Sequence, residues 1–220
     1  MKGFIILLIV IFIVICCKKE HAKVVATPTP FSNILILGNS ITYSPPNSSI
    51  GWYGNWGMAA SVADSDYVHI LTARFKQLNG NCKVNVENIA AFELGFTTFN
   101  LDSAFMTYKN TKPDLVIIRI GEDVQAGFNA TLFDAKYAAL VNYFKTANPD
   151  VKIFAAGSFW AGKDAVDAIM KKYSQFISLS HLSADLSTES YGLFTNPGIE
   201  PHPSDKGMRE ISNAIWTLLQ

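Results

Sequence analysis

Two residues far apart in the chain could together carry out nucleophilic chemistry: Ser40 and His202. Ser40 follows the aliphatic run ILIL at 34–37, which is typical of a strand buried on both faces of a sheet. A serine hydroxyl becomes a nucleophile only beside a base. His202 is the best candidate base, because its loop, GIEPHPSDKGM, leads directly into a predicted helix. The positive end of that helix would lower the pKa of the imidazole and keep it neutral.

The other three histidines fit this role less well. His21 lies in a polar N-terminal stretch, and His69 lies within a predicted helix. His181 follows the last predicted strand and stays open as an alternative base.

The elements that must position these residues alternate along the chain. Strands are expected at 33–37, 83–88, 114–120, 151–156 and 175–180, and helices at 59–79, 98–109, 131–147, 162–174 and 205–219. Aliphatic strands that alternate with helices predict a parallel sheet covered on both faces. We therefore expect a flavodoxin-like, three-layer α/β/α sandwich of about five parallel strands, with reacting groups gathered at the carboxyl ends of the strands. Ser40 would lie at such an end.

The N-terminus has the pattern of a bacterial lipoprotein signal. One lysine precedes an apolar run that ends at Cys16 and Cys17, and charged residues follow. The run is short for a membrane span and suits a signal segment. We expect a signal peptide at 1–16, lipidation of Cys17, a flexible tether at 17–32 and the folded domain at 33–220. Cleavage before Cys16 and an uncleaved anchor stay open; each places the domain at a bacterial membrane, extracytoplasmic, in the periplasm or at the surface.

Composition excludes several classes of function. Lys+Arg and Asp+Glu balance at 18 each, so nucleic acid is not an expected partner. Only Cys82 remains in the body of the chain, which contains no CxxC or HExxH motif. A structural zinc site is therefore not expected, and the serine–histidine chemistry needs no cofactor and no metal.

Two motifs together resemble one enzyme family. GNSIT, around Ser40, is similar to the GDSxT block of the SGNH (GDSL-type) esterases and lipases, and HPSDKGM, around His202, is similar to that family's closing block. The resemblance covers the body of the chain, from about residue 33 to 219, with both blocks in the family's order. It implies a serine esterase that hydrolyses carboxylic esters by acyl transfer.

The resemblance also implies an oxyanion hole, formed by the N–H of Ser40, a glycine and an asparagine. Gly95 is the favoured glycine, and an alternative register places Glu93 there. RIGEDV resembles the family's GxND block, but Asp123 stands where the asparagine is expected. A carboxylate cannot donate a hydrogen bond to an oxyanion unless it is protonated, so this departure predicts a modified or impaired site.

The acid that orients the histidine is a second departure. The family often has an aspartate three residues before the histidine, where this chain has Ile199. Glu200 could take that role from a shifted loop, or the site could work as a dyad with a backbone carbonyl holding the imidazole. Asn39 replaces the aspartate of the GDS block, and its amide can make similar structural hydrogen bonds.

The loop after Ser40 carries Trp52, Tyr53 and Trp56. Such rings suit sugar rings or acyl chains beside a nucleophile, or they pack over the sheet as structure. The resemblance and this loop together suggest that the substrate is an ester and that the reaction is deacetylation of a glycan; the resembled family also includes lipid and small-ester hydrolases, and the sequence does not separate these. The alternative is a catalytically impaired, glycan-binding surface lipoprotein with the same fold.

Overall fold

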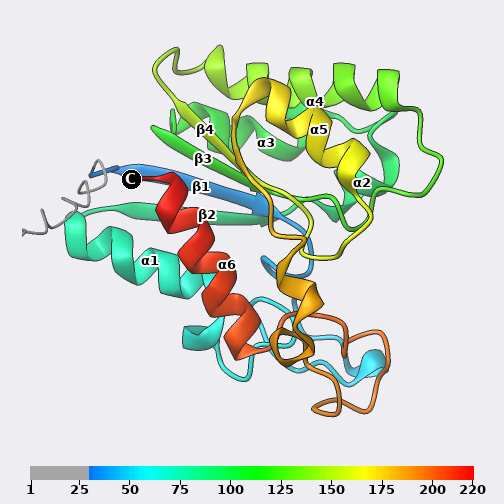
Figure 1. The fold of residues 1–220 in the computed structure, drawn as a ribbon. Helices are drawn as coiled ribbons and strands as arrows, with labels where there is room; N and C mark the ends of the chain where they lie inside the picture. The colour runs from blue at the N-terminus through cyan, green and yellow to red at the C-terminus, as the bar shows by residue number, and fades with distance from the viewer. Residues whose placement is uncertain (1–29) are drawn as a thin grey trace, which may run out of the picture.

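The computed structural model describes residues 30–220, and the predicted signal segment, Cys17 and most of the predicted tether lie outside them. A five-stranded parallel sheet forms the centre of the domain (Figure 1). Its order is β2-β1-β3-β4-β5, the flavodoxin-like order, which confirms the predicted fold class. The strands are β1 (Asn33–Gly38), β2 (Lys83–Asn88), β3 (Leu115–Arg119), β4 (Lys152–Ala156) and β5 (Gln175–Ile177).

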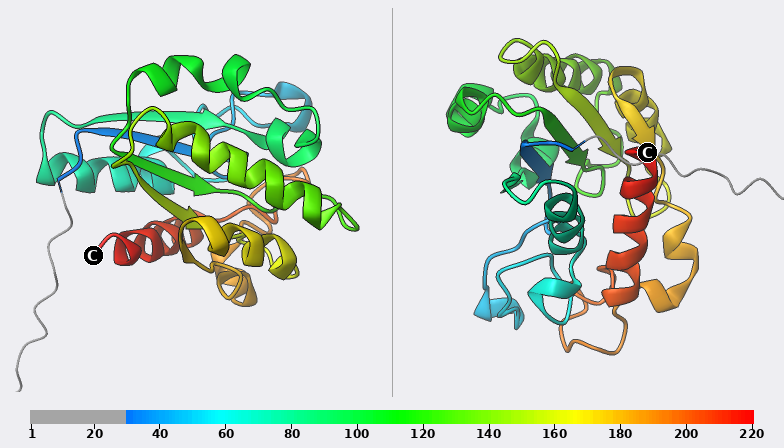
Figure 2. Two further views of the ribbon diagram at one scale, coloured as in Figure 1. Left: turned by 90° about the horizontal axis from the view of Figure 1, so that it is seen from above. Right: turned by 90° about the vertical axis from the view of Figure 1, so that its left-hand side faces the viewer.

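Helices cover both faces of the sheet, as Figures 1 and 2 show. They are α1 (Tyr67–Leu78), α2 (Ala90–Gly95), α3 (Leu101–Asn110), α4 (Ala130–Lys145), α5 (Asp164–Tyr173) and α6 (Asp205–Leu218). Alternate residues of β1 enter opposite cores, because successive side chains of a strand point to opposite faces. Leu35 and Leu37 pack with apolar residues of α3, α4 and α5, whereas Ile34 and Ile36 pack with those of α1 and α6.

Two helical segments differ from the prediction. The helix expected at 59–79 begins only at Tyr67, because Asp66 caps it and its carboxylate accepts the N–H groups of His69 and Gly57. Residues 59–66 instead form a loop with one short 3-10 helix, Ala63–Ser65. The short helix α2 was not predicted, although its sequence AAFELG is rich in good helix formers.

The folded domain begins slightly before the predicted boundary at residue 33. Phe31 is buried against Phe75, with ring centroids 6.5 Å apart, and the Ser32 N–H donates to the Asp114 carboxylate. Both residues were assigned to the tether. None of the helices within residues 30–220 has the length and apolar character needed to cross a membrane.

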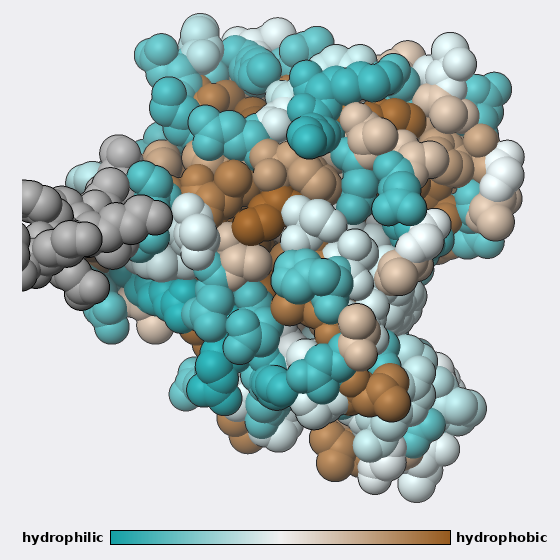
Figure 3. All heavy atoms as spheres, in the orientation of Figure 1, coloured by the Kyte–Doolittle hydropathy of each residue, from teal (hydrophilic) through white to brown (hydrophobic). Residues whose placement is uncertain are grey.

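Two long loops form a lobe beyond the carboxyl edge of the sheet. They run from residue 44 to 66 and from 178 to 204, and they lie together at the bottom of Figure 1. A small apolar cluster of Trp52, Met58, Ala59 and Ile199 joins them. Apolar side chains also emerge on this lobe, visible as brown spheres in Figure 3.

Gly38 is required where β1 turns into the lobe. A Cβ atom on this residue would lie 2.7 Å from the Arg119 carbonyl oxygen and would also collide with the Thr42 side chain. Because a backbone atom cannot move aside easily, we expect Gly38→Ala to destabilise the protein by about 2 kcal/mol, as overpacking in a tight core does. Gly80→Ala is the control, since nothing lies within 4 Å of that position. Urea unfolding checks the difference, and equal stability of the two variants would contradict it.

Candidate active site

Ser40 and His202 meet at the carboxyl edge of the sheet. The Ser40 Oγ lies 2.9 Å from the His202 Nε2. Ser40 sits on a tight turn in which the Asn39 carbonyl accepts the N–H groups of Thr42 and Tyr43, and its own carbonyl accepts the Met58 N–H. The pair therefore has the geometry in which an imidazole can take the hydroxyl proton.

Backbone and aromatic groups hold the His202 ring. Its Nδ1 lies 3.2 Å from the Ile199 carbonyl oxygen, and the Trp160 ring meets it edge to face at a centroid distance of 5.7 Å. His202 is 6% exposed. Burial lowers the pKa of His202 to about 4, although the hydrogen bond with Ile199 and the charge of Glu122 act in the opposite direction. The imidazole is therefore neutral, and able to act as a base, across the neutral pH range.

The structure does not bring Glu200 to the imidazole. The Glu200 Oε1 accepts the Gly192 N–H at 2.9 Å, while the Ile199 carbonyl occupies the position beside the His202 Nδ1. Within residues 30–220 the arrangement is a serine–histidine dyad oriented by a main-chain carbonyl. The physical reason is the path of the loop, which presents the carbonyl of residue 199, and not the side chain of residue 200, to the ring.

The two predicted donors other than Ser40 occupy different surroundings. Gly95 is the last residue of α2, where a backbone N–H is normally used by the helix itself. The free N–H groups of a helix lie in its first turn. That turn follows Asn88, the partner of Gly38 in the sheet, so it lies close to the serine turn. Within residues 30–220 neither Ser40 nor Ala91 donates its N–H to an acceptor, which makes Ala91 a better-placed donor than Gly95.

A buried polar network lies beneath the serine turn. Arg119 is fully buried and makes two hydrogen bonds to the Glu122 carboxylate, of 2.8 and 3.0 Å. Its guanidinium also donates to the Asn39 Oδ1 at 2.5 Å. The Asn39 Nδ2 in turn donates to Glu122 and to Glu93, at 2.7 and 2.9 Å. We call these four residues the Asn39–Glu93–Arg119–Glu122 network.

The network gives its carboxyl groups different acidities. Burial alone would raise the pKa of Glu122, but the charge and hydrogen bonds of Arg119 bring it below its ordinary value. Burial, together with the charges of Glu122 and Asp123, raises the pKa of Glu93 to about 8. Burial and then the charge of Glu122 also raise the pKa of Asp123. The carboxyl group of Asp123 therefore keeps a proton to higher pH than a free aspartate does.

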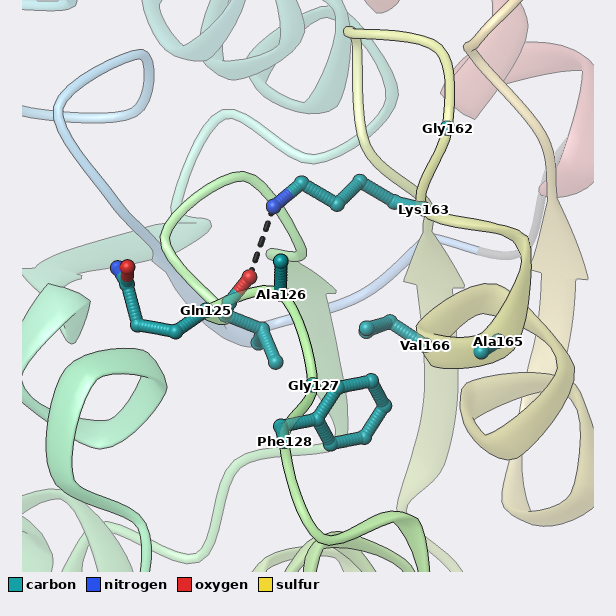
Figure 4. A pocket seen from close by; sticks show the side chains of 9 residues that line it. Gln125, Ala126, Gly127, Phe128, Gly162, Lys163, Ala165 and Val166 are labelled. Atoms are coloured by element: carbon teal, nitrogen blue, oxygen red, sulfur yellow. Dashed lines mark hydrogen bonds between the residues drawn. The ribbon is translucent and has the colours of Figure 1, made fainter.

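A hollow lies beyond the ends of β3 and β4, beside the segment that follows Asp123. A cavity of about 290 Å³ separates residues 124–128 from residues 162–166, and Figure 4 shows Phe128 and Lys163 on its opposite sides. The Lys163 Nζ donates to the Val124 carbonyl at 2.7 Å. This contact fastens the segment after Asp123 and keeps a positive charge near its carboxyl group.

The three aromatic residues of the loop have different surroundings. Trp52 is only 3% exposed, and its indole N–H donates to the Ser44 carbonyl, so most of this ring is structural packing. Tyr53 is 74% exposed. Trp56 is half-buried and meets Trp52 edge to face. All three line a hollow of about 290 Å³. A second hollow of about 430 Å³ reaches Ser204, two residues after His202 in the chain, and Phe194 lines both hollows.

The sheet order 2-1-3-4-5, with a serine after the first strand and a histidine before the last helix, matches the fold that the sequence motifs predicted, that of the SGNH (GDSL-type) hydrolases. No known family profile matches the sequence, and no curated protein matches it.

Solved structures share the fold at low sequence identity. A putative GDSL-like lipase from Parabacteroides merdae matches with a TM-score of 0.58 and 16% identity, over 86% of this chain and 96% of that one. A two-domain esterase active on acetylated mannans, crystallised with mannopentaose, matches with a TM-score of 0.55 and 16% identity, over 86% of this chain and 48% of that one. An active-site mutant of a family two carbohydrate esterase from Clostridium thermocellum matches with a TM-score of 0.53 and 17% identity, over 87% of this chain and 64% of that one. The chain thus spans about half the length of the two-domain esterase, and these likenesses establish a fold that esterases use.

Sequence reasoning missed several residues of the site. Trp160 and Glu122 were not singled out, and nothing local in the sequence marks either one. A glutamate in a strand-end turn is unremarkable until the buried Arg119 is seen beside it. Ala91 was not predicted as a donor, because a backbone N–H requires no particular side chain and so leaves no mark in the sequence.

The contact of Glu200 with Gly192 leads to a prediction. Glu200→Gln keeps an oxygen that can accept the Gly192 N–H, so we expect kcat/KM on an aryl acetate to change by less than about threefold. Loss of a true orienting acid costs orders of magnitude. Steady-state kinetics check this, and a loss of about a hundredfold or more would instead make Glu200 the orienting acid.

Proposed function

We propose that the protein is a serine ester hydrolase that works through the Ser40–His202 dyad. The observation that carries the proposal is the 2.9 Å contact between the Ser40 Oγ and the His202 Nε2, made by a histidine that burial keeps neutral. Asp123 and the lack of a carboxylate beside the imidazole are departures that the mechanism must accommodate.

The mechanism is acyl transfer to water. The His202 Nε2 takes the proton of Ser40 as the Oγ attacks the ester carbonyl, and a tetrahedral intermediate forms. The imidazolium keeps its Nδ1–H on the Ile199 carbonyl, so the ring stays aimed at the leaving group. His202 then protonates the leaving alcohol. A water molecule, deprotonated by the same nitrogen, attacks the acyl-enzyme, and Ser40 regains its proton as the acid departs.

Main-chain donors would stabilise the oxyanion. The N–H groups of Ser40 and Ala91 have no acceptor within residues 30–220, and they belong to neighbouring strand ends. Free N–H groups aimed at a developing charge are the main feature of an oxyanion hole. Asp123 would contribute a third hydrogen bond only in its protonated form.

An acetylated carbohydrate is the favoured substrate. Of the three solved structures described above, one is an esterase active on acetylated mannans and another is a family two carbohydrate esterase. The two hollows of the loop lobe are lined in part by Tyr53, Trp56 and Phe194, and one of them reaches Ser204, two residues after His202. Such aromatic surface suits the faces of sugar rings. Lipidation at Cys17 would hold the enzyme at a bacterial membrane in the cell envelope, where such polymers are met.

Acetate release by the residue 24–220 protein tests the proposal. We expect hydrolysis of 4-nitrophenyl acetate and release of acetate from acetylated mannan or xylan. Ser40→Ala and His202→Ala should each reduce kcat by at least about 10³-fold, because each removes a group that acts in the reaction. Ser178→Ala, an exposed serine elsewhere in the domain, serves as the control. A folded wild-type protein with no more activity than Ser40→Ala on a broad ester panel would contradict the proposal.

The unusual carboxyl group of Asp123 gives a pH prediction. As the pH rises through the raised pKa of Asp123, the group loses its proton and its charge opposes the oxyanion. Wild-type kcat should therefore fall towards neutral pH, and Asp123→Asn, whose amide always donates, should remove this fall and raise kcat at pH 7. Asp150→Asn is the exposed control. A pH profile that is the same in wild type and Asp123→Asn would show that the carboxyl group does not act on the oxyanion.

The second candidate is a glycan-binding protein that has lost efficient catalysis. Asp123 favours it, because a carboxylate in that position opposes the chemistry. Calorimetric titration of Ser40→Ala and wild type with acetylated and deacetylated oligosaccharides distinguishes the two. A binding protein would bind both forms without turnover, whereas the enzyme would bind the acetylated form preferentially in the Ser40→Ala variant.

A further inference from the structure

We propose that Asn39 and Glu93 form a coupled pair of positioning residues, which sets both the nucleophile turn and the turn that carries Asp123. The inference rests on the proposed function, because it assigns roles within the same site. Asn39 directly precedes Ser40. Glu93 lies in α2, 54 residues further along the chain, and the side chains meet through a buried 2.9 Å hydrogen bond.

Asn39 uses both ends of its amide. Its Nδ2 donates to two carboxyl groups, the Glu93 Oε1 and the Glu122 Oε2. Its Oδ1 accepts from the Arg119 guanidinium and from the Ile41 N–H on the far side of Ser40. The Ile41 contact means that the Asn39 side chain spans the nucleophile, so its orientation determines the shape of the Ser40 turn.

Glu93 fastens a different part of the site with its other oxygen. The Glu93 Oε2 accepts the N–H groups of Gly121 and Asp123, at 2.7 and 3.0 Å. One buried carboxyl group thus joins α2, the turn after β1 and the turn after β3. Removing it would leave two buried backbone donors without an acceptor, which proteins tolerate poorly.

Charge explains why residue 39 is an asparagine where the resembled family has an aspartate. The network contains one guanidinium, that of Arg119, and two carboxyl groups. The other titratable groups that bear on these carboxyls include Tyr67, Asp123, Asp167 and His202, and none of these four supplies a second permanent positive charge. An aspartate at 39 would place an oxygen where the Nδ2 now donates, against two carboxyl oxygens at once. Asn39 therefore suits a Glu93 whose two oxygens both accept hydrogen bonds, and a change at either residue removes that match.

A double-mutant cycle tests this pairing. Asn39→Asp adds a third carboxyl group, and Glu93→Gln places an amide nitrogen against the Asn39 Nδ2. We expect each single variant to lower kcat on 4-nitrophenyl acetate, per active serine titrated with a fluorophosphonate, by at least about tenfold with little change in KM. The double variant Asn39→Asp/Glu93→Gln restores a donor facing an acceptor and the original number of carboxyl groups. It should be at least about tenfold more active than Asn39→Asp alone.

Asn148→Asp is the matched control. Asn148 is also anchored at both ends of its amide, by Pro113 and Asp150, but it precedes β4 and lies at the opposite edge of the sheet from Ser40. It should lower the melting temperature without changing kcat per titrated serine. A merely structural role for Asn39 and Glu93 would give the same result.

The remaining outcomes decide between the two proposals. Unchanged kcat per titrated serine in Asn39→Asp, or single effects that simply add in the double variant, would overturn the pairing while the esterase proposal stands. If wild type hydrolyses no ester, the proposed function fails and the positioning role of the pair fails with it. The melting temperatures then show only whether the two side chains are coupled: they are coupled if the double variant melts above Asn39→Asp, and they are not if the two shifts add.

Discussion

The ion pair between Arg119 and Glu122 is the interaction on which the rest of the site depends. Both groups are buried, and taking two charges out of water costs more than their attraction returns unless the remaining hydrogen-bonding positions are filled. Here Asn39 and the Phe159 N–H fill those on Glu122. The pair therefore obliges the turns after β1, β3 and β4 to converge on one point. Of the three guanidinium nitrogens of Arg119, only Nε has no hydrogen-bond partner among residues 30–220.

The same acidic centre bears on the histidine. A carboxylate beside the His202 Nδ1 would stabilise the imidazolium and raise its pKa, whereas the Ile199 carbonyl does so more weakly. Glu122 adds a favourable charge from a distance, against the dominant effect of burial. In place of one close carboxylate, His202 therefore has the Ile199 carbonyl at its Nδ1 and the more distant charge of Glu122. Because the pKa of His202 is low, its imidazole stays unprotonated at mildly acidic pH. At such pH the carboxyl group of Asp123 keeps its proton more readily than a free aspartate does.

Periodicity and motif predicted the parts of the structure that depend on local chemistry. The sequence pattern located all five strands, four of them to within one residue at each end, because buried parallel strands are rich in aliphatic residues; the fifth, expected at 175–180, ends at Ile177. The start of α1 and the whole of α2 were missed. The side chain of Asp66 caps α1 and sets where it begins, and Glu93 ties α2 to the turn after β3. The carbonyl at Ile199 could not be read from side-chain identities, since any residue carries one.

Strand β1 separates the N-terminal end of the folded domain from the candidate active site. Phe31 and Ser32 dock at the amino edge of the sheet, and Ser40 lies past the opposite end of the same strand. A strand of six residues spans roughly 20 Å at about 3.3 Å per residue. A support attached at the N-terminus, as the expected lipidation would provide, would therefore join the domain at the end of β1 opposite to Ser40 and leave the carboxyl edge of the sheet open.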